Sequence, residues 1–339
     1  MLSFTCDYLE GAHPEILKKL SQTNLEQTVG YGEDDYCLSA KEKIKKAIDN
    51  PNADIYFLCG GTQTNQIAIA GLLKPYEGVI CADSGHINVH EAGAIEYCGH
   101  KVLAIPQHDG KINSTDLQEY LSQFYADDNQ QHMVYPGMVY ISYPTEYGTL
   151  YSRRELEDIY ALCKKYDLTF YIDGARLGYG VVRGENSLKD IAHLCDVFYI
   201  GGTKIGALFG EALIFCNNNT PKHFTTVIKQ HGALLAKGRM LGIQFDCLFQ
   251  DDLYIEICQR ADEMADEIRR AFKSKNYRLV YENCTNQVFV LMSKTQIERL
   301  KTKVDFAVWD KYDEDTYITR FVSSWATTLQ NVEILRSLI

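Results

Sequence analysis

The sequence lacks the excess of positive charge that proteins use to bind nucleic acids or anionic membranes. Its formal net charge is −11, with 45 acidic residues against 34 lysines and arginines. This balance argues against DNA, RNA or a lipid surface as the main partner. No apolar run approaches the roughly 20 residues that span a bilayer, and the first residues do not have the pattern of a secretory signal. We therefore expect a soluble, cytoplasmic protein with no nucleic-acid or membrane partner.

The sequence also lacks paired cysteines. Its eleven cysteines are scattered, and none belongs to a Cys-x-x-Cys pair. This argues against a zinc ribbon, a dithiol redox site and a disulfide framework, and it fits a reducing compartment. His86 and His90 have the i, i+4 spacing of a helical metal site, but no further histidine follows at the required spacing. We therefore expect no metal.

The chain has no internal repeat or low-complexity segment, and its 339 residues are enough for two domains of unequal size. Short apolar runs alternate with helical patterns from about residue 39 to 216, which predicts a mostly parallel sheet flanked by helices. Further on, a long helix over 253–274 is followed by strand-like runs and a helix over 294–301, which predicts a smaller α+β domain. The expected division is an N-terminal segment (1–20), a large α/β domain (21–245) and a small C-terminal α+β domain (246–339).

Several elements can be placed individually. The run 39–48 is predicted to be a helix with a serine cap at Ser39, and 87–99 is predicted to be a helix that ends at Gly99. Residues 152–167 have a strong amphipathic pattern, and "YRLVY" (277–281) is strand-like.

Glycines and charged residues follow several of the predicted strands. "TFYID" ends in Asp173, "DVFYIGGTK" ends in Thr203 and Lys204, and "IYFLCGGT" ends in Gly61 and Thr62. In open α/β sheets, ligands bind beyond the carboxyl ends of the strands. We therefore expect these residues to meet at one site.

A single cofactor would explain why Asp173 and Lys204 each follow a predicted strand. An unpaired aspartate at the end of a buried strand is costly, and a pyridinium ring would supply the missing positive charge opposite Asp173. Lys204 could hold the aldehyde of the same ring as a Schiff base. Each residue alone also has an ordinary explanation: Lys204 as a surface lysine, and Asp173 as the cap of the following helix.

A phosphate would need an anion site of its own. The glycine at 61 lets the backbone approach a ligand, and Thr62 or Thr64 capping the next helix would leave its N-terminal N–H groups facing the anion. Thr203 would add a hydroxyl beside the lysine. His86 could lie flat on the ring. Together these residues favour pyridoxal 5'-phosphate as the cofactor.

These motifs, in this order, resemble the threonine aldolase group of β-eliminating lyases, which belong to the fold type I (aspartate-aminotransferase-like) pyridoxal-phosphate enzymes. The motifs extend over essentially the whole chain: "YGEDDY", "GGTQTNQIA", "HINVHEAGA", "DGARL", "GGTK" and "RFVSSWATT". The resemblance implies that the large domain binds the cofactor. It also implies that Lys204 is the Schiff-base lysine, Asp173 the partner of the pyridine nitrogen and His86 the ring-stacking histidine. These three are the expected catalytic residues. Arg176 of the DGAR motif would lie close to the cofactor.

The resemblance also assigns residues that contact the substrate or a second subunit. Arg320 matches the arginine that holds the substrate carboxylate. Its alternative is a salt-bridged surface arginine, but Ile318 and Val322 lie on its own strand face, a setting that calls for an anionic partner. Tyr31 resembles a tyrosine that completes the neighbouring subunit's site. Lys237 resembles a phosphate contact across a dimer interface, with a solvated loop lysine as the alternative. We expect a homodimer or homotetramer.

The sequence departs from the family pattern at several points, and "GGTK" and "GALLAKGR" replace the usual Ser-Lys-Gly and Met-Arg-Gln runs. Gly60 replaces the serine of the phosphate turn, Cys6 in "TCDY" replaces a substrate-contacting serine, and Glu146 in "YPTEYGT" replaces a histidine expected to meet the substrate hydroxyl. We count Cys6 and Glu146 among the substrate-binding residues, and they leave the β-substituent open.

The expected activity is that of a low-specificity L-threonine aldolase, which cleaves a β-hydroxy-α-amino acid to glycine and an aldehyde. The acceptor of the hydroxyl proton stays open between His86, Glu146 and a water. β-Elimination or transamination of another amino acid is the alternative reaction. The third functional hypothesis is a binding scaffold with the same fold and no cofactor.

Overall fold

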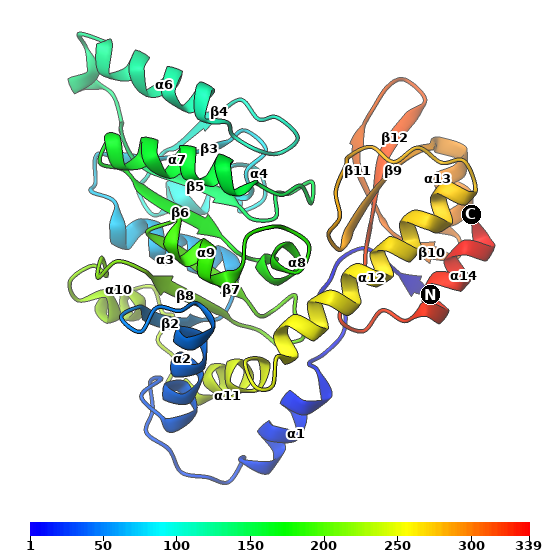
Figure 1. Cartoon of the computed structure of the whole chain (residues 1–339), viewed down its shortest axis with the longest axis horizontal. Coiled ribbons are helices and arrows are strands. Elements are labelled where there is room, and N and C mark those ends of the chain that lie inside the picture. The colour runs from blue at the N-terminus through cyan, green and yellow to red at the C-terminus, as the bar shows by residue number, and fades with distance from the viewer.

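The computed structural model describes residues 1–339, which form a large α/β body and a smaller α+β body (Figure 1). A seven-stranded sheet with the order β2-β8-β7-β6-β5-β3-β4 lies at the centre of the large body. Strand β8 is antiparallel to both of its neighbours, and every other pair is parallel. The predicted α/β class with a mostly parallel sheet is confirmed. The strands are β2 (Asp54–Leu58), β3 (Glu77–Ala82), β4 (Val102–Ile105), β5 (Tyr135–Ser142), β6 (Thr169–Asp173), β7 (Val197–Gly201) and β8 (Glu211–Phe215).

Helices cover both faces of this sheet because its strands are apolar on both sides. In β6, Phe170 and Ile172 join one hydrophobic core, while Tyr171 points into the other. The first core also takes residues from α2, α6, α7, α8, α9 and α11, and the second from α3, α4, α5 and α10. The helices of this body and the segment before it are α1 (Pro14–Gln22), α2 (Asp35–Ala47), α3 (Gly61–Leu72), α4 (His86–Val89), α5 (Ala94–Tyr97), α6 (Ser114–Ala126), α7 (Arg153–Lys165), α8 (Leu177–Val181), α9 (Leu188–His193), α10 (Phe224–Gln230) and α11 (Arg239–Leu248), with a short 3-10 turn at Gln130–His132.

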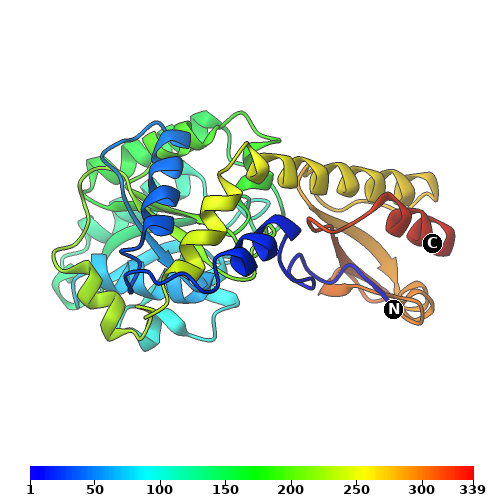
Figure 2. The same cartoon turned by 90° about the horizontal axis from the view of Figure 1, so that it is seen from below.

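The smaller body is built on a three-stranded antiparallel sheet with the order β11-β12-β9. Helix α12 is amphipathic and runs from the large body along the whole length of the small one (Figure 2). The elements are α12 (Leu253–Ser274), β9 (Gln287–Ser293), α13 (Lys294–Lys301), β10 (Val304–Asp305), β11 (Ala307–Lys311), β12 (Thr316–Val322) and α14 (Leu329–Leu338).

The first residues of the chain pair with the small body. Strand β1 (Leu2–Ser3) is parallel to β10, and Phe4 is buried in the same core as Phe321. Because α1 and the rest of the chain then continue along the large body, the segment that follows Phe4 crosses between the two bodies (Figures 1 and 2). This crossing brings residues 5–7 to the junction.

Three local predictions are wrong. Residues 87–99 form the two separate turns α4 and α5, because Ala92 and Gly93 adopt positive φ values of 53° and 72° between them. Helix α2 begins earlier than Ser39, since the Asp34 side chain caps it by accepting from the Cys37 N–H at 3.0 Å. The run 277–281 contributes only a single bridge, at Leu279, and no strand.

Two further features concern the chain as a whole. None of its helices combines the length and the apolar character that crossing a membrane requires. All eleven cysteines are free thiols, and six of them are buried among apolar residues, where small sulfur-containing side chains pack well.

Candidate active site

The residues predicted to follow the strands meet at one edge of the central sheet. Asp173 is the last residue of β6, and Gly201, the last residue of β7, lies opposite Glu211, the first residue of β8. Because β8 is antiparallel, its beginning lies at the edge where the parallel strands end. Lys204 follows β7 by three residues, and Gly61 begins α3 at the end of β2. The sheet thus gathers charged groups from three strands, and the glycine turn after a fourth, in one place.

Asp173 is buried and held by four neutral donors. Its Oδ1 accepts from the Tyr199 hydroxyl at 2.5 Å and the Ala175 N–H at 3.0 Å. Its Oδ2 accepts from the Tyr140 hydroxyl at 2.6 Å and Asn65 Nδ2 at 3.0 Å. Burial opposes the charged form, but His86 and these hydrogen bonds outweigh it and hold the pKa of Asp173 below its ordinary value. Asp173 is therefore a carboxylate before any ligand binds.

His86 is the partly exposed member of a second hydrogen-bond network, whose other members, Glu91 and Asn65, are buried. Its Nδ1 lies 2.7 Å from Glu91 Oε1, and the same oxygen accepts from Asn65 Nδ2 at 2.8 Å. The Glu91 side chain is fully buried, whereas the His86 side chain is 35% exposed. Since Asn65 also donates to Asp173, one amide joins the carboxylates of Glu91 and Asp173. His86 therefore has one edge fixed inside the protein and the other free to meet a ligand.

Glu146 lies beside His86 and is held through only one of its oxygens. Its Oε1 accepts from the Ser142 hydroxyl at 2.5 Å and from the His86 backbone N–H at 3.0 Å. Its Oε2 has no hydrogen-bond partner on another residue. Burial raises the pKa of the Glu146 carboxyl above its ordinary value. Glu146 is thus an anchored carboxyl with one free oxygen and increased basicity.

Lys204 has no side-chain partner. No residue accepts a hydrogen bond from its Nζ, and only its backbone carbonyl is held, by the Tyr179 hydroxyl at 2.7 Å. Burial, and next the positive charge of Arg176, lower the pKa of the Lys204 amine. A lysine that is unpaired and easily deprotonated is suited to react with a carbonyl group.

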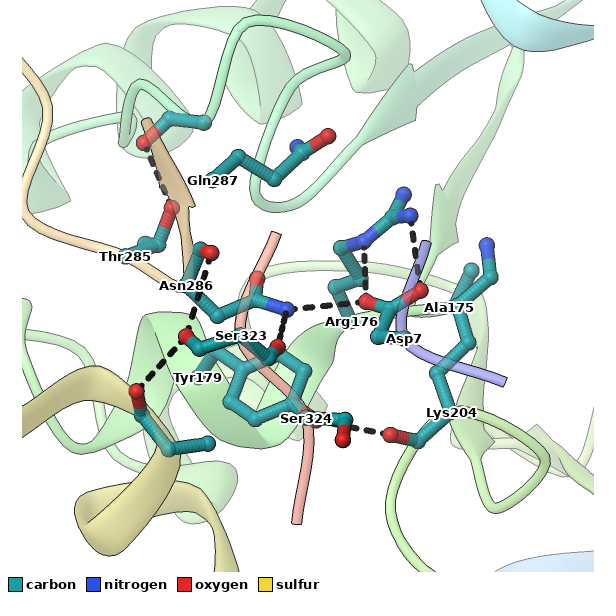
Figure 3. A network of polar contacts seen from close by, with 12 residues as sticks. Asp7, Ala175, Arg176, Tyr179, Lys204, Thr285, Asn286, Gln287, Ser323 and Ser324 are labelled. Atoms are coloured by element: carbon teal, nitrogen blue, oxygen red, sulfur yellow. Dashed lines mark hydrogen bonds and ion pairs between the residues drawn. The ribbon is translucent and has the colours of Figure 1, made fainter. Parts of the chain in front are cut away.

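Arg176 is paired to a residue at the far end of the sequence. Its Nε and Nη2 contact Asp7 Oδ2 and Oδ1 at 2.7 and 3.0 Å, and Asn286 Nδ2 donates to Asp7 Oδ2 at 2.8 Å (Figure 3). Asp7 is fully buried. Burial opposes its charge, but Arg176 and Lys204 hold the pKa of Asp7 below its ordinary value. Asp7 therefore links the large body, the N-terminal segment and the small body beside Lys204.

Arg320 lies in β12 and has no anionic partner. Its Nη1 and Nη2 donate only to neutral oxygens, Gln287 Oε1 at 3.2 Å and the Thr5 carbonyl at 3.3 Å. Its buried Nε has no partner, and its guanidinium stacks 4.4 Å from the centre of the Trp309 ring. Burial, and next Arg176, lower the pKa of Arg320 to about 10. The Thr5 contact places Cys6, which is partly buried, directly beside this guanidinium.

The predicted threonine cap of α3 is wrong. Gly60 is the N-cap residue, no side chain caps the helix, and Thr64 Oγ1 donates to the Gly60 carbonyl at 3.0 Å instead. Thr62 is exposed in the first turn. A Cβ on Gly61 would lie 3.1 Å from the Tyr199 hydroxyl, so glycine keeps this approach open. The uncapped N–H groups of the first turn remain available to a ligand.

The hydroxyl of Thr203 is engaged inside the protein. Its Oγ1 lies 2.8 Å from Glu211 Oε1 and accepts from the Gly210 N–H at 3.0 Å. Glu211 is buried, with only 4% of its surface exposed. Burial, its largest influence, raises the pKa of Glu211 to about 8.

Tyr31 and Lys237 lie together on the surface and make no bond with this cluster. The Tyr31 N–H donates to the Ala236 carbonyl at 3.2 Å, which places it beside Lys237 in the loop between α10 and α11. Tyr31 is 50% exposed and lies under Lys229, and Lys237 is exposed. Within one chain, the structure does not bring either residue to Lys204.

The polar groups of the site that sequence reasoning missed include Asp7, Asn65, Glu91 and Glu211. Asp7 follows Cys6 in the "TCDY" stretch and Asn65 lies within "GGTQTNQIA", so each was present in a recognised motif. Glu91 carried a weaker signal, its place directly after His90 on the predicted helix. Glu211 carried none, because a charged residue at the start of an apolar run commonly faces solvent.

Comparisons with known proteins agree with this geometry. A family profile described as beta-eliminating lyase matches residues 4–295. The chain is 28% identical to a low specificity L-threonine aldolase of Pseudomonas aeruginosa, covering 98% of this chain and 95% of that protein. It is 29% identical to another from a Pseudomonas species, covering 96% and 93%. A solved structure of a Leishmania major threonine aldolase superposes with a TM-score of 0.95 at 41% identity, covering 100% and 99% of the two chains.

Proposed function

Because the chain belongs to the beta-eliminating lyase family, we propose that it is a pyridoxal-phosphate-dependent carbon–carbon lyase that cleaves L-threonine and related β-hydroxy-α-amino acids to glycine and an aldehyde. The observation that carries this proposal is Arg320, a half-buried cation that meets only neutral acceptors and whose buried Nε has no partner. It lies in the same junction as Lys204, which also has no partner. The carboxylate of an amino acid would give Arg320 the anion that it lacks, and the aldehyde of the cofactor would give Lys204 a carbonyl group with which to react.

The residues present fit pyridoxal phosphate. Lys204 offers an unpaired amine of lowered pKa to the aldehyde, and the uncapped start of α3 offers N–H groups to the phosphate. When bound, the cofactor supplies a ring that accepts the charge left on the substrate carbon. Asp173 would hold the ring nitrogen. Its four acceptor positions are filled, so one rotatable tyrosine hydroxyl, of Tyr140 or Tyr199, has to turn away.

The substrate carboxylate would be oriented by Arg320. Gln287 and the Thr5 carbonyl fix two of its nitrogens, and Trp309 covers one face of the guanidinium. A planar, stacked guanidinium favours a carboxylate in its own plane, with two parallel hydrogen bonds. Cys6, which follows Thr5, would line the same side.

We propose that Glu146 accepts the proton of the β-hydroxyl. Its Oε1 is anchored by Ser142 and by the His86 backbone, so Oε2 is the free end, and burial makes it a stronger base. Glu146→Gln is expected to lower kcat by roughly 10²- to 10⁴-fold, the usual range for a lost general base. In the wild type, kcat/KM should rise with pH as Glu146 ionises, and this limb should disappear in the variant. If the limb persists in Glu146→Gln but disappears in His86→Asn, His86 is the base.

The activity itself is tested with a panel of amino acids. L-Threonine or L-allo-threonine should yield acetaldehyde and glycine, and Lys204→Ala should yield neither and lose the yellow colour that borohydride bleaches in the wild type. No aldehyde from any β-hydroxy amino acid would refute the proposal. Pyruvate from serine or cysteine derivatives would establish β-elimination instead, and conversion of the cofactor to its pyridoxamine form would establish transamination.

We further propose that the enzyme works as a homodimer or a higher homo-oligomer, in which Tyr31 and Lys237 complete the site of a neighbouring subunit. The support is that both residues are exposed and adjacent, yet separate from Lys204. Lys204→Ala and Tyr31→Ala subunits should each be nearly inactive alone, whereas mixed dimers regain one intact site. No recovery after confirmed subunit exchange would show that Tyr31 is not shared.

A further inference from the structure

Glu211 closes a ring of hydrogen bonds around the two residues that precede Lys204. Its Oε1 lies 2.8 Å from Thr203 Oγ1, and its Oε2 accepts from the Gly202 N–H at 3.1 Å. The Gly210 carbonyl accepts from the N–H groups of Gly202 and Thr203 at 2.9 and 3.1 Å. The Gly210 N–H donates back to Thr203 Oγ1 at 3.0 Å. Position and direction of the Gly202–Thr203 segment are therefore fixed by the start of β8.

Burial favours the neutral form of Glu211. No lysine or arginine forms an ion pair with it. The positive charge of Lys204 favours the ionised form, but burial outweighs it, and the negative charge of Asp173 adds to the effect of burial. The pKa of Glu211 is raised to about 8 in consequence. The other titratable groups that face it are neutral hydroxyls, those of Tyr171, Tyr199 and Tyr254.

A proton on Glu211 decides where the Thr203 hydroxyl hydrogen points. A hydroxyl group has one hydrogen to donate and two lone pairs to accept with. The Gly210 N–H occupies one lone pair of Thr203 Oγ1. An ionised Glu211 has to take the hydroxyl hydrogen. A protonated Glu211 donates to the second lone pair instead, which leaves the Thr203 hydrogen free for another acceptor.

We propose that Glu211 is a positioning residue that, as a neutral carboxylic acid, donates to Thr203 and turns the Thr203 hydroxyl toward the phosphate monoester of a ligand held beside Lys204. This inference rests on the proposed function, because it takes a phosphorylated cofactor as the ligand. Glutamine is the matched substitute. Its Nε2 can donate to Thr203 while its Oε1 accepts from Gly202, which reproduces the neutral acid at every pH.

The first test needs no ligand and no reaction. The folded protein holds the Glu211 proton up to about pH 8, whereas the unfolded chain releases it near 4.5. The stability that this proton contributes is therefore complete below pH 4.5 and is lost as the pH rises through 8. In thermal unfolding of the apoprotein, the stability of Glu211→Gln relative to the wild type should increase steadily between pH 5 and 8. A constant difference would mean that Glu211 is ionised throughout and would overturn the proposal, whatever the enzyme's activity.

The second test measures phosphate recognition with pyridoxamine 5'-phosphate, which carries the ring and the phosphate but no aldehyde. Its affinity for the wild-type apoprotein should fall above pH 8 by up to about tenfold per pH unit relative to Glu211→Gln, because binding then requires proton uptake by Glu211. Glu211 and Lys204 act on each other's pKa, so the same comparison in a Lys204→Ala background removes the effect of Lys204 titration. Identical pH profiles would overturn the proposal.

A third variant keeps Glu211 intact, in case Glu211→Gln does not fold. Thr203→Val removes the hydroxyl and should weaken pyridoxamine 5'-phosphate binding at pH 7 by roughly 10- to 100-fold, as expected for one hydrogen bond to a charged group. Thr203→Ser, which keeps the hydroxyl, is the control and should bind as the wild type does. The wild type should bind pyridoxamine 5'-phosphate more tightly than Thr203→Val, and this difference in affinity should become smaller above pH 8, because the ionised Glu211 then accepts the hydroxyl hydrogen. An advantage that is absent at pH 7, or that is independent of pH, would contradict the proposed role.

Discussion

Replacing Arg320 by methionine distinguishes a substrate-binding arginine from a structural one. The pKa of Arg320 is lowered from 12.5 to about 10, so the folded protein disfavours the charged form. At about 1.4 kcal/mol per pKa unit, this corresponds to at most about 3 kcal/mol, since some solvent contact screens the group. The penalty applies at every pH below 10, where the guanidinium is charged. Methionine has a similar length and carries no charge, so it removes this penalty.

The contacts that methionine loses are of similar size. Stacking on Trp309 contributes about 1 kcal/mol, and each of the bonds to Gln287 and Thr5 about 1 kcal/mol. We therefore expect the free energy of unfolding of the apoprotein to change by no more than about 1 kcal/mol. Binding of an amino acid should suffer much more. Two charge-assisted hydrogen bonds together contribute about 3 kcal/mol, a loss of roughly a hundredfold in affinity.

Urea unfolding of the apoprotein and titration of the holoenzyme with glycine measure the two quantities separately. Arg176→Met is the matched control, because Arg176 is bound to the buried Asp7 by two hydrogen bonds. Removing one partner of such a pair should cost about 3–5 kcal/mol. If Arg320→Met loses as much stability as Arg176→Met, or binds glycine like the wild type, then Arg320 is structural and the substrate carboxylate lies elsewhere.

Three other substitutions test the surroundings of the site. Asp7→Asn leaves Arg176 without its carboxylate and should lower the free energy of unfolding in urea by about 3–5 kcal/mol, and a loss below 1 kcal/mol would show that Arg176 does not depend on Asp7. Burial raises the pKa of Asp262 to about 8 although Arg183 Nε lies 3.5 Å from its Oδ2, so thermal stability should fall between pH 4 and 8 more steeply in the wild type than in Asp262→Asn, and equal slopes would contradict this. Trp309→Leu removes the ring that covers Arg320 and should weaken glycine binding to the holoenzyme about fivefold, and unchanged binding would show that the stacking does not orient the guanidinium.

The central sheet could be predicted from the sequence because its signals are local. The apolar run before Asp173 and the Gly-Gly break before Lys204 each specify a strand and its end without reference to the rest of the chain. The rule that ligands bind beyond the strand ends then gathers these residues at one edge. The helix 253–274 was predictable for the same reason, since its apolar positions repeat with the helical period over its whole length.

The contacts that complete the site are not local and have no such signal. Asp7 and Arg176 are 169 residues apart, and their pairing depends on β1 joining β10 in the small body. The alternating pattern up to residue 216 does not specify the direction of each strand, and only an antiparallel β8 brings Glu211 to the active edge. The helix expected over 87–99 failed because its periodicity continues across Ala92, where the chain adopts a positive φ that a helix does not allow.

The two carboxyl groups at this edge show how burial alone does not determine charge. Asp173 and Glu211 are both almost fully buried, at 3% and 4% exposure, and each lies within the field of the other. Asp173 accepts four hydrogen bonds, three of them from the side chains of Tyr140, Tyr199 and Asn65, and these stabilise its anion. As an anion, Glu211 would accept only from a shared backbone N–H and one hydroxyl. These bonds and the attraction of Lys204 are too little to offset its desolvation, to which the repulsion by Asp173 adds. Because Asp173 has more hydrogen-bond donors than Glu211, Asp173 is the ionised group, opposite the expected ring nitrogen. Glu211 is the protonated group and lies behind Thr203.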